Sequence, residues 1–304
     1  MTTATSTPPT ALPAATRTTR TRNPRMARRV ASILTWAAAA IVFISSVFPV
    51  YWMVNTSLQP NAQVRGSELH FWPDNFTLEN YTSVITGDTR APFLPALGNS
   101  LAVTLLTVAV ALVFAFFAAI AVTRFRFRSR AGFIIAILIV QMVPAEAMII
   151  AIFRLIDGWH LLNTIIGLSA VYIATVLPFT IWTLRGFIHG VPADLEEAAM
   201  IDGLSRAGAF WKITFPLLAP GLVATGIFGF IQAWNEFVFA LVLNPRPEAM
   251  TLPVWLRTFL DPNGGINWAE LMAASTLVAI PVVVFFLIVQ GRMTGGLVAG
   301  AVKG

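Results

Sequence analysis

Long, uninterrupted blocks of apolar residues dominate the chain, and shorter polar stretches separate them. A bilayer core about 30 Å thick is crossed by roughly 20 helical residues, and charge-free runs of that length are typical of membrane-spanning helices. Only two formally charged residues, Glu146 and Glu236, fall inside the blocks. The pattern predicts six transmembrane segments, at residues 31–53, 101–122, 132–153, 161–182, 217–243 and 271–289.

The same blocks predict helices rather than strands. Backbone amides in lipid must be satisfied within their own segment or within a closed barrel, and barrel strands alternate polar and apolar residues. None of the blocks shows that alternation. Of all residues, 57% are hydrophobic and 11% are charged, whereas about 25% are charged in soluble domains. We therefore expect an all-α, polytopic membrane protein.

The distribution of the basic residues indicates the orientation of the chain across the membrane. Cytoplasmic loops near helix ends collect Lys and Arg, and with an inside N-terminus 15 of the 20 basic residues fall in inner segments. Both termini are therefore predicted to be cytoplasmic, and the net charge of +6 is no sign of nucleic-acid binding. The outer segments hold the other five: Arg65, Arg90, Arg154, Arg246 and Arg257.

The domain organisation follows from composition. Residues 1–30, rich in Thr, Ala, Pro and Arg, predict a disordered basic cytoplasmic tail, and residues 31–304 predict one transmembrane domain. The polar loop between the first two spans lies outside and could contact an external partner. In the inner loop 123–130, Arg alternates with Phe and Ser. A strand would fit, but a short positively charged interfacial turn fits better.

Signatures of enzymes and of bound cofactors are missing from the sequence. There is no Walker A loop, Gly-rich dinucleotide turn, zinc-ligand spacing or nucleophile elbow. Cysteine is absent, and His70, His160 and His189 are scattered in loops. We expect no enzymatic activity, no metal and no cofactor in this chain. If ATP drives its function, another chain must bind the nucleotide.

One cytoplasmic loop, residues 190–216, carries strong local signals. Asp194 is a candidate helix cap, with Glu197 at the spacing of a capping box. Gly203 then predicts a left-handed helix stop, and Ser205 predicts the cap of a second short helix. Acids at the first turn also suit the helix dipole.

This loop has two interpretations. Two short helices joined at a glycine form a knob that could enter a cleft of a partner, where small residues permit close approach and the acids could pair with a basic residue. Alternatively, the loop is an amphipathic connector. The residues expected to share one face are Leu195, Ala198, Ala199 and Asp202.

The run Glu197-Ala198-Ala199-x-x-Asp202-Gly203, followed by Phe210, Ile213 and Pro216, resembles the EAA loop of binding-protein-dependent ABC importer permeases. The run Trp234-Asn235-Glu236-Phe237 and the Gly-rich C-terminus narrow the resemblance to the maltose-type, MalG-like carbohydrate permeases. The resemblance extends from about residue 30 to the end. Phe215 departs from it, because the family more often has Leu before the proline.

The resemblance implies a type I ABC permease fold and a heteromeric importer in the bacterial inner membrane. Its partners would be a second, MalF-like permease, two ATPase subunits that bind ATP and Mg, and an extracytoplasmic sugar-binding protein. Di- or oligosaccharides are the expected substrates. The tail 291–304 would extend toward the ATPases, or is a frayed terminus. The implied coupling residues are Glu196, Glu197, Ala198, Ala199, Asp202 and Gly203.

Polar residues inside the spans mark a candidate substrate path. Ionisable groups at membrane depth normally face a bundle interior or a wet path. Gln232 and Glu236 are four residues apart and should share a helix face, with Asn235 beside them. Trp234 or Phe239 could offer an aromatic wall to a sugar ring. The alternative is that these groups form interhelical hydrogen bonds, and in the maltose-type family the sugar contacts lie mainly in the other permease.

Glu146 follows Pro144 in the third predicted span. It is a candidate gate residue, or a helix-packing group near a proline kink. Competing functions are an ion-coupled secondary transporter or a channel, which predict inverted repeats and broken helices, and an ABC permease for glycerol phosphate or polyols. No repeat is evident in the sequence.

Overall fold

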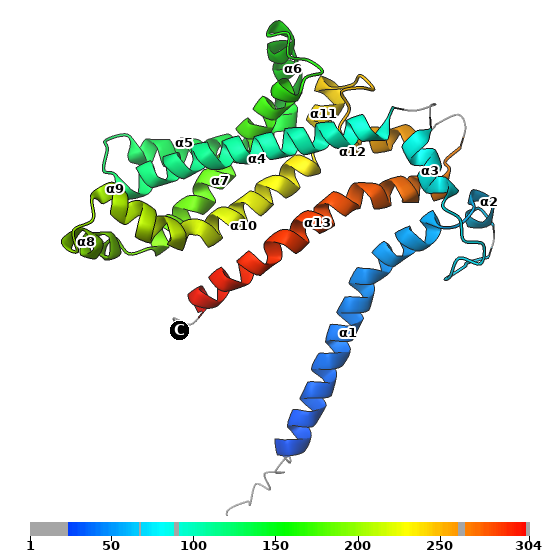
Figure 1. Ribbon diagram of the computed structural model, residues 1–304, viewed down its shortest axis with the longest axis horizontal. Helices are drawn as coiled ribbons and strands as arrows, with labels where there is room; N and C mark the ends of the chain where they lie inside the picture. The colour runs from blue at the N-terminus through cyan, green and yellow to red at the C-terminus, as the bar shows by residue number, and fades with distance from the viewer. Residues whose placement is uncertain (1–23, 67, 88–90, 261–264, 302–304) are drawn as a thin grey trace, which may run out of the picture. The chain divides into compact units, whose positions relative to one another are not determined.

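The computed structural model describes residues 24–301 except 67, 88–90 and 261–264 (Figure 1). Most of the predicted basic tail, residues 1–23, and the last residues of the predicted C-terminal tail, 302–304, lie outside the described residues. Throughout the described part every regular element is a helix, as predicted. The long helices are α1 (Pro24–Ser57), α4 (Phe93–Arg124), α7 (Ile165–Gly190), α10 (Phe215–Trp234) and α13 (Trp268–Ala301).

Shorter helices connect or extend the long ones. Along the chain, α2 (Asn61–Val64) and α3 (Glu79–Thr86) precede α4. After α4 come α5 (Arg130–Met142), η1 (Ala145–Met148) and α6 (Ile149–Gly158). The loop before α10 contains α8 (Asp194–Ile201), α9 (Arg206–Ala209) and η2 (Phe210–Thr214). After α10 come α11 (Val238–Leu243), α12 (Leu252–Leu256) and η3 (Arg257–Phe259).

Five helices among the described residues are long and apolar enough to cross a membrane, and the pair α5 and η1–α6 makes a sixth span if it is counted as one. That pair is bent by 80°, so the continuous third helix predicted at 132–153 is wrong. Val143 adopts an extended conformation (φ −82°, ψ 120°) before Pro144, because proline disfavours the helical region for the residue before it and provides no N–H.

Two other predicted spans have different ends. The span predicted at 217–243 stops at Trp234, and α11 is a separate helix. The span predicted at 161–182 begins only at Ile165, after His160 and Asn163 take positive φ angles of 55° and 57°. Since such residues do not continue a right-handed helix, they fix where α7 starts. The loop at 125–129 contains no strand, as expected.

The chain divides into two units, residues 1–51 and 52–304. In the first unit α1 presents exposed apolar side chains along residues 32–50, which suits a hydrocarbon surrounding rather than water. In the second unit α4, α7 and α10 pack together, as Figure 1 shows.

Small residues allow the close packing of α4, α7 and α10. Ala111, Ala115 and Ala119 on α4 are buried. A Cβ at Gly221 on α10 would lie 2.5 Å from the ring of Phe187 on α7, so no larger residue fits there without movement. Small residues at helix contacts are the usual basis of helix association in membranes, where van der Waals packing replaces the hydrophobic effect.

Candidate functional site

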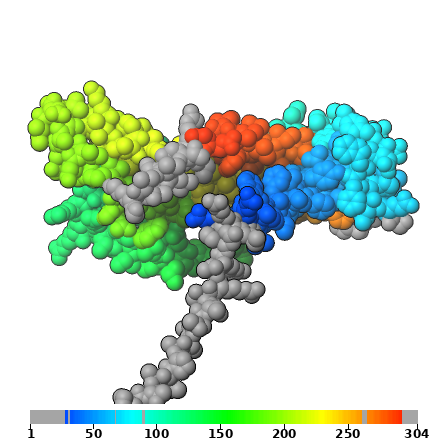
Figure 2. Space-filling model, turned by 90° about the horizontal axis from the view of Figure 1, so that it is seen from below, coloured from blue at the N-terminus to red at the C-terminus, as the bar shows by residue number. Residues whose placement is uncertain are grey.

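The loop between α7 and α10 forms an elbow at Gly203. Gly203 has φ +92°, and its N–H donates to the carbonyl of Met200 (3.1 Å) while the N–H of Leu204 donates to the carbonyl of Ala199 (3.1 Å). This pair of bonds is the Schellman helix stop, so the stop predicted at this glycine is confirmed. Figure 2 shows the segment in yellow-green at one end of the second unit.

The caps of the two short helices differ in outcome. Ser205 accepts a hydrogen bond from the N–H of Gly208 (3.1 Å), as predicted. The cap predicted at Asp194 is wrong, because Ala193 already has helical dihedrals and the carbonyl of Ala193 accepts from the amides of Glu196 and Glu197. Asp194 is therefore the first helical residue, where its charge still favours the helix dipole.

Glu196 is held by its own domain. Its carboxylate lies 3.5 Å from the guanidinium of Arg124 at the end of α4 and accepts a hydrogen bond from the hydroxyl of Thr214 (2.7 Å). Arg124 also donates to the carbonyl of Val191 (3.0 Å). The expectation that both acids are available to a partner therefore changes: Glu196 ties the elbow to α4, and Glu197 is exposed.

The predicted face of α8 is exposed except at one residue, and Leu195 on it is 42% exposed. Ala199 is buried against its own domain, whereas Ala198 is exposed, since neighbouring helical residues point about 100° apart. Glu197, Ala198, Ile201 and Asp202 are exposed. Ile201 is 86% exposed and was not identified as a candidate residue from the sequence. Its position, four residues after Glu197 and three after Ala198, places it on the same helix face as these two residues.

A cavity of about 160 Å³ brings together several of the predicted path residues. The polar groups Glu146, Gln232 and Glu236 line it, and so does Phe239. Tyr172 and Thr175 of α7, two hydroxyl residues not identified from the sequence, also line it. Glu146 lies in η1, the short helix that follows Pro144, and its role as a gate or as a helix-packing group stays a prediction.

Glu236 lies in the gap between α10 and α11. Its carboxylate accepts from the N–H groups of Phe239 (2.8 Å) and Ala240 (3.1 Å) and from the hydroxyl of Tyr172. It does not share a helix face with Gln232 as predicted, because α10 has ended at Trp234. These bonds satisfy the acid and fix the start of α11, which is one role of a charged group near a helix N-terminus.

Two predicted path residues lie away from the cavity. Trp234 is 2% exposed and packs in the core beside Phe230, with ring centroids 5.5 Å apart. It cannot serve as a wall for a sugar, because apolar neighbours cover it. Asn235 is exposed and donates to the carbonyl of Ile231 in its own helix (2.9 Å).

Comparison with known proteins identifies the family. Residues 83–295 match the family described as "Binding-protein-dependent transport system inner membrane component". The diacetylchitobiose uptake system permease protein DasC of Streptomyces coelicolor is 44% identical over 88% of this chain and 95% of its own. The trehalose transport system permease protein SugB of Mycobacterium tuberculosis is 36% identical over 88% and 97%.

A further relative and a solved structure agree. The trehalose/maltose transport system permease protein MalG of Thermococcus litoralis is 36% identical, covering 90% of this chain and 97% of its own. A chain of a bacterial ABC transporter that imports alginate has the same fold, with a TM-score of 0.74 at 23% identity, covering 87% of this chain and 97% of its own.

These findings identify a multi-pass membrane protein of a family of transport components rather than enzymes. They also rule against the ion-coupled carrier and the channel that the sequence had left as alternatives. The chain belongs to the family of binding-protein-dependent transport system inner membrane components, and it is a permease with the fold of an ABC importer.

Proposed function

We propose that this chain is one of two permease subunits of an ATP-driven importer of di- or oligosaccharides, and that the elbow at Gly203 couples it to the ATPases. The observation that supports this best is that α8 has one acid bound to its own domain and other residues exposed. Glu196 is tied inward to Arg124 and Thr214, while Glu197, Ala198 and Ile201 are exposed. One face thus engages the permease, and the other is available to an ATPase cleft.

The contacts of the elbow offer a path for movement. A displacement of α8 would be passed through the Glu196–Arg124 pair to the end of α4. Since α4 packs along α7 and α10, these helices would move together, as rigid elements do when one interface is driven. ATP and Mg would be bound by the partner subunits, and no cofactor is proposed in this chain.

The proposed assembly has a definite orientation. The elbow and both termini face the cytoplasm, and the loops around α2, α3 and α12 face outward. There a sugar-binding protein would deliver the substrate, which fits the description of the family as binding-protein-dependent. A second, MalF-like permease would cover the exposed apolar side chains of α4, such as Phe114 and Phe117, with lipid covering the rest.

The lining of the cavity at Glu146 and Glu236 favours an uncharged substrate over an anion. Glu146 and Gln232 in its lining offer hydrogen-bond acceptors and donors to hydroxyl groups. No Lys or Arg is found among its lining residues, so an anion such as glycerol phosphate would meet two carboxylates without a compensating cation. This favours a sugar over glycerol phosphate; a polyol would meet the same groups, and uptake assays must separate the two.

Reconstitution tests the proposal. The chain, its companion permease and the ATPases are placed in liposomes with the binding protein, and uptake of trehalose and of diacetylchitobiose is measured with and without ATP. Glu197→Lys should lower the rate of ATP-driven uptake about 100-fold or more, while membrane insertion stays normal. Glu197→Lys combined with Glu196→Lys should also release the ATPases from the isolated complex.

Asp194→Lys is the matched control, because Asp194 is an exposed acid on the same short helix but outside the proposed coupling set. It should retain most of the uptake. Full ATP-driven uptake by the Glu197→Lys variant would refute the coupling role. Sugar uptake by the chain alone, without ATPases, would refute the importer assignment itself.

A further inference from the structure

A second and larger cavity, of about 370 Å³, lies far from the elbow. It is formed by the end of α1, by α2 with the loop that follows it, and by the start of α13. Its volume falls within the range of about 300–1,000 Å³ of small-molecule sites. The first residues of α4 pack near this region and Arg124 at its other end holds the elbow, so the cavity belongs to the proposed outer face.

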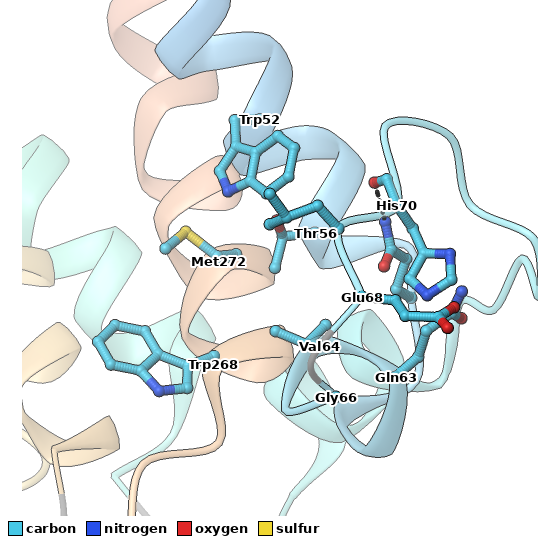
Figure 3. A pocket seen from close by; sticks show the side chains of 11 residues that line it. Trp52, Thr56, Gln63, Val64, Gly66, Glu68, His70, Trp268 and Met272 are labelled. Carbon is cyan, nitrogen blue, oxygen red and sulfur yellow. Dashed lines mark hydrogen bonds between the residues drawn. The ribbon is translucent and has the colours of Figure 1, made fainter.

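The lining of this cavity is divided into two kinds of surface. Figure 3 shows the indoles of Trp52 and Trp268 with Met272 on one side, and Gln63, Glu68 and His70 on the other. Trp268 is 43% exposed, so its ring is accessible. An aromatic face is electron-rich and attracts polarised C–H groups, whereas amide, carboxylate and imidazole groups bond hydroxyls.

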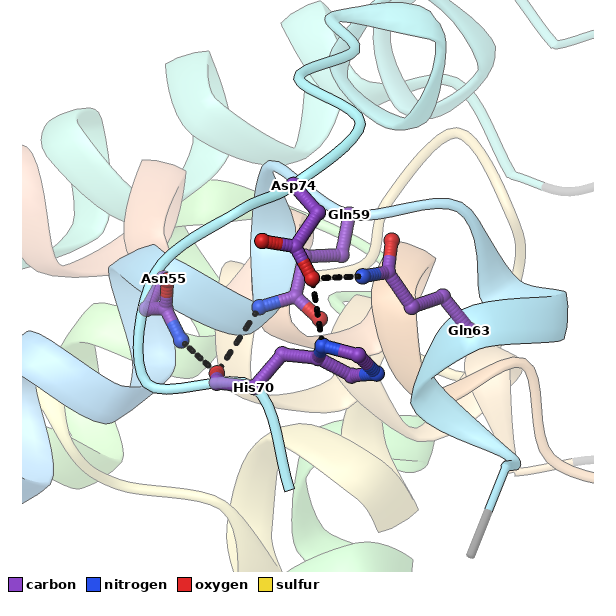
Figure 4. A network of polar contacts seen from close by, with 5 residues as sticks. All are labelled: Asn55, Gln59, Gln63, His70 and Asp74. Atoms are coloured by element: carbon purple, nitrogen blue, oxygen red, sulfur yellow. Dashed lines mark hydrogen bonds and ion pairs between the residues drawn. The ribbon is translucent and has the colours of Figure 1, made fainter. Parts of the chain in front are cut away.

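A network of side chains holds the polar side in place (Figure 4). The carbonyl of His70 accepts from the side-chain amides of Asn55 (2.9 Å) and Gln59 (3.4 Å). The Nδ1 atom of His70 lies 2.6 Å from the carboxylate of Asp74, which also accepts from Gln63 (3.4 Å). Groups fixed in this way bind a ligand at lower entropic cost.

The aromatic side is also fixed. Phe71 packs edge-on against Trp52, with ring centroids 5.8 Å apart and an interplanar angle of 70°. Arg65 donates to the carbonyl of Ile266 (3.1 Å) and thereby ties the α2 segment to the chain just before Trp268. The two indoles therefore lie on one surface that is held together by contacts between distant parts of the sequence.

The charge of the lining residues limits which class of ligand the cavity can bind. Glu68 and His70 are its titratable residues, and no Lys or Arg is among the lining residues, so an anion would find no cation. A pyranose ring matches both surfaces, because one face of the ring carries C–H groups and its edge carries hydroxyls. We propose that this cavity is a subsite for one ring of the transported carbohydrate, occupied on entry at the outer face; this rests on the proposed function.

Binding to the intact complex tests the subsite. The permease pair with its ATPases is placed in nanodiscs without binding protein, and equilibrium binding of radiolabelled trehalose and diacetylchitobiose is measured. Trp268→Ala should weaken binding about tenfold, the effect of losing one aromatic contact. Trp72→Ala is the matched control, since Trp72 lies in the same loop region, is 73% exposed and does not line the cavity.

Further variants guard against loss of folding. Trp268→Phe keeps an aromatic face and should restore most of the affinity, and Glu68→Gln, at an exposed position, should weaken binding severalfold. The proposal is overturned if the wild-type complex binds neither sugar, or if Trp268→Ala and Trp72→Ala bind equally well.

A protein-docking role gives a different result. In that case Trp268→Ala would weaken capture of the sugar-loaded binding protein and leave sugar binding unchanged, which also overturns the subsite. ATP-driven uptake by the wild-type complex is measured in parallel. If uptake is present while the Trp268 variants behave like wild type, the subsite fails and the importer function stands.

Discussion

The pair formed by Arg124 and Glu196 provides the sharpest test of how the elbow is connected to the membrane helices. Their side chains are 18% and 16% exposed and lie 3.5 Å apart. Exposed ion pairs contribute about 0–1 kcal/mol, and breaking a fully buried pair costs about 3–5 kcal/mol. This pair is mostly buried but lies at a moderate distance, so we expect an interaction free energy of about 1–2 kcal/mol.

A double-mutant cycle measures that free energy directly. Uptake rates and thermal stability are compared for the wild type, Arg124→Gln, Glu196→Gln and the double variant. Glu196→Gln keeps an acceptor for the hydroxyl of Thr214, so it removes mainly the charge. Each single variant should lower uptake by about 5–30-fold, the factor that corresponds to 1–2 kcal/mol, and the double variant should be little worse than either.

Lys212 supplies the control for the cycle, because it is an exposed cation in the same loop with no ion pair to Glu196. Lys212→Gln and Glu196→Gln should combine additively. If Arg124→Gln and Glu196→Gln were also additive within about 0.5 kcal/mol, the pair would transmit nothing, and the proposed route from the elbow to α4 would be refuted.

The remaining predictions concern single positions. Gly203→Ala should destabilise the elbow by about 1–2 kcal/mol, because φ +92° strains any side chain although the space is open; ATPase binding should weaken, and an unchanged affinity would contradict this. Gly221→Ala should cost about 1–3 kcal/mol in thermal unfolding, since its Cβ would lie 2.5 Å from the ring of Phe187. Gly186→Ala meets nothing within 4 Å and should not destabilise the protein, because Ala is favoured over Gly inside a helix by about 1 kcal/mol. Tyr172→Phe removes one donor to Glu236 and should lower the melting temperature by an amount equivalent to about 1–3 kcal/mol; no loss of stability would show that the bond is not important.

Local chemistry was readable from the sequence because its causes are local. The apolar runs fixed where membrane spans lie, since the thickness of the bilayer sets their length. Gly203 and Ser205 act through turns of a few residues, so their roles followed from residue type alone. Pro144 marked a break, although the 80° bend depends on how the flanking helices pack.

Long-range contacts were decided only by the tertiary structure. Nothing in the sequence near Glu196 indicates that Arg124 comes within 3.5 Å, or that Trp234 is packed into the core while Phe239 reaches a cavity. Trp52 and Trp268 lie near opposite ends of the chain and line one cavity. Hydropathy predicts which segments enter the membrane, but the helix faces that meet are chosen by side-chain packing, which a linear pattern does not specify.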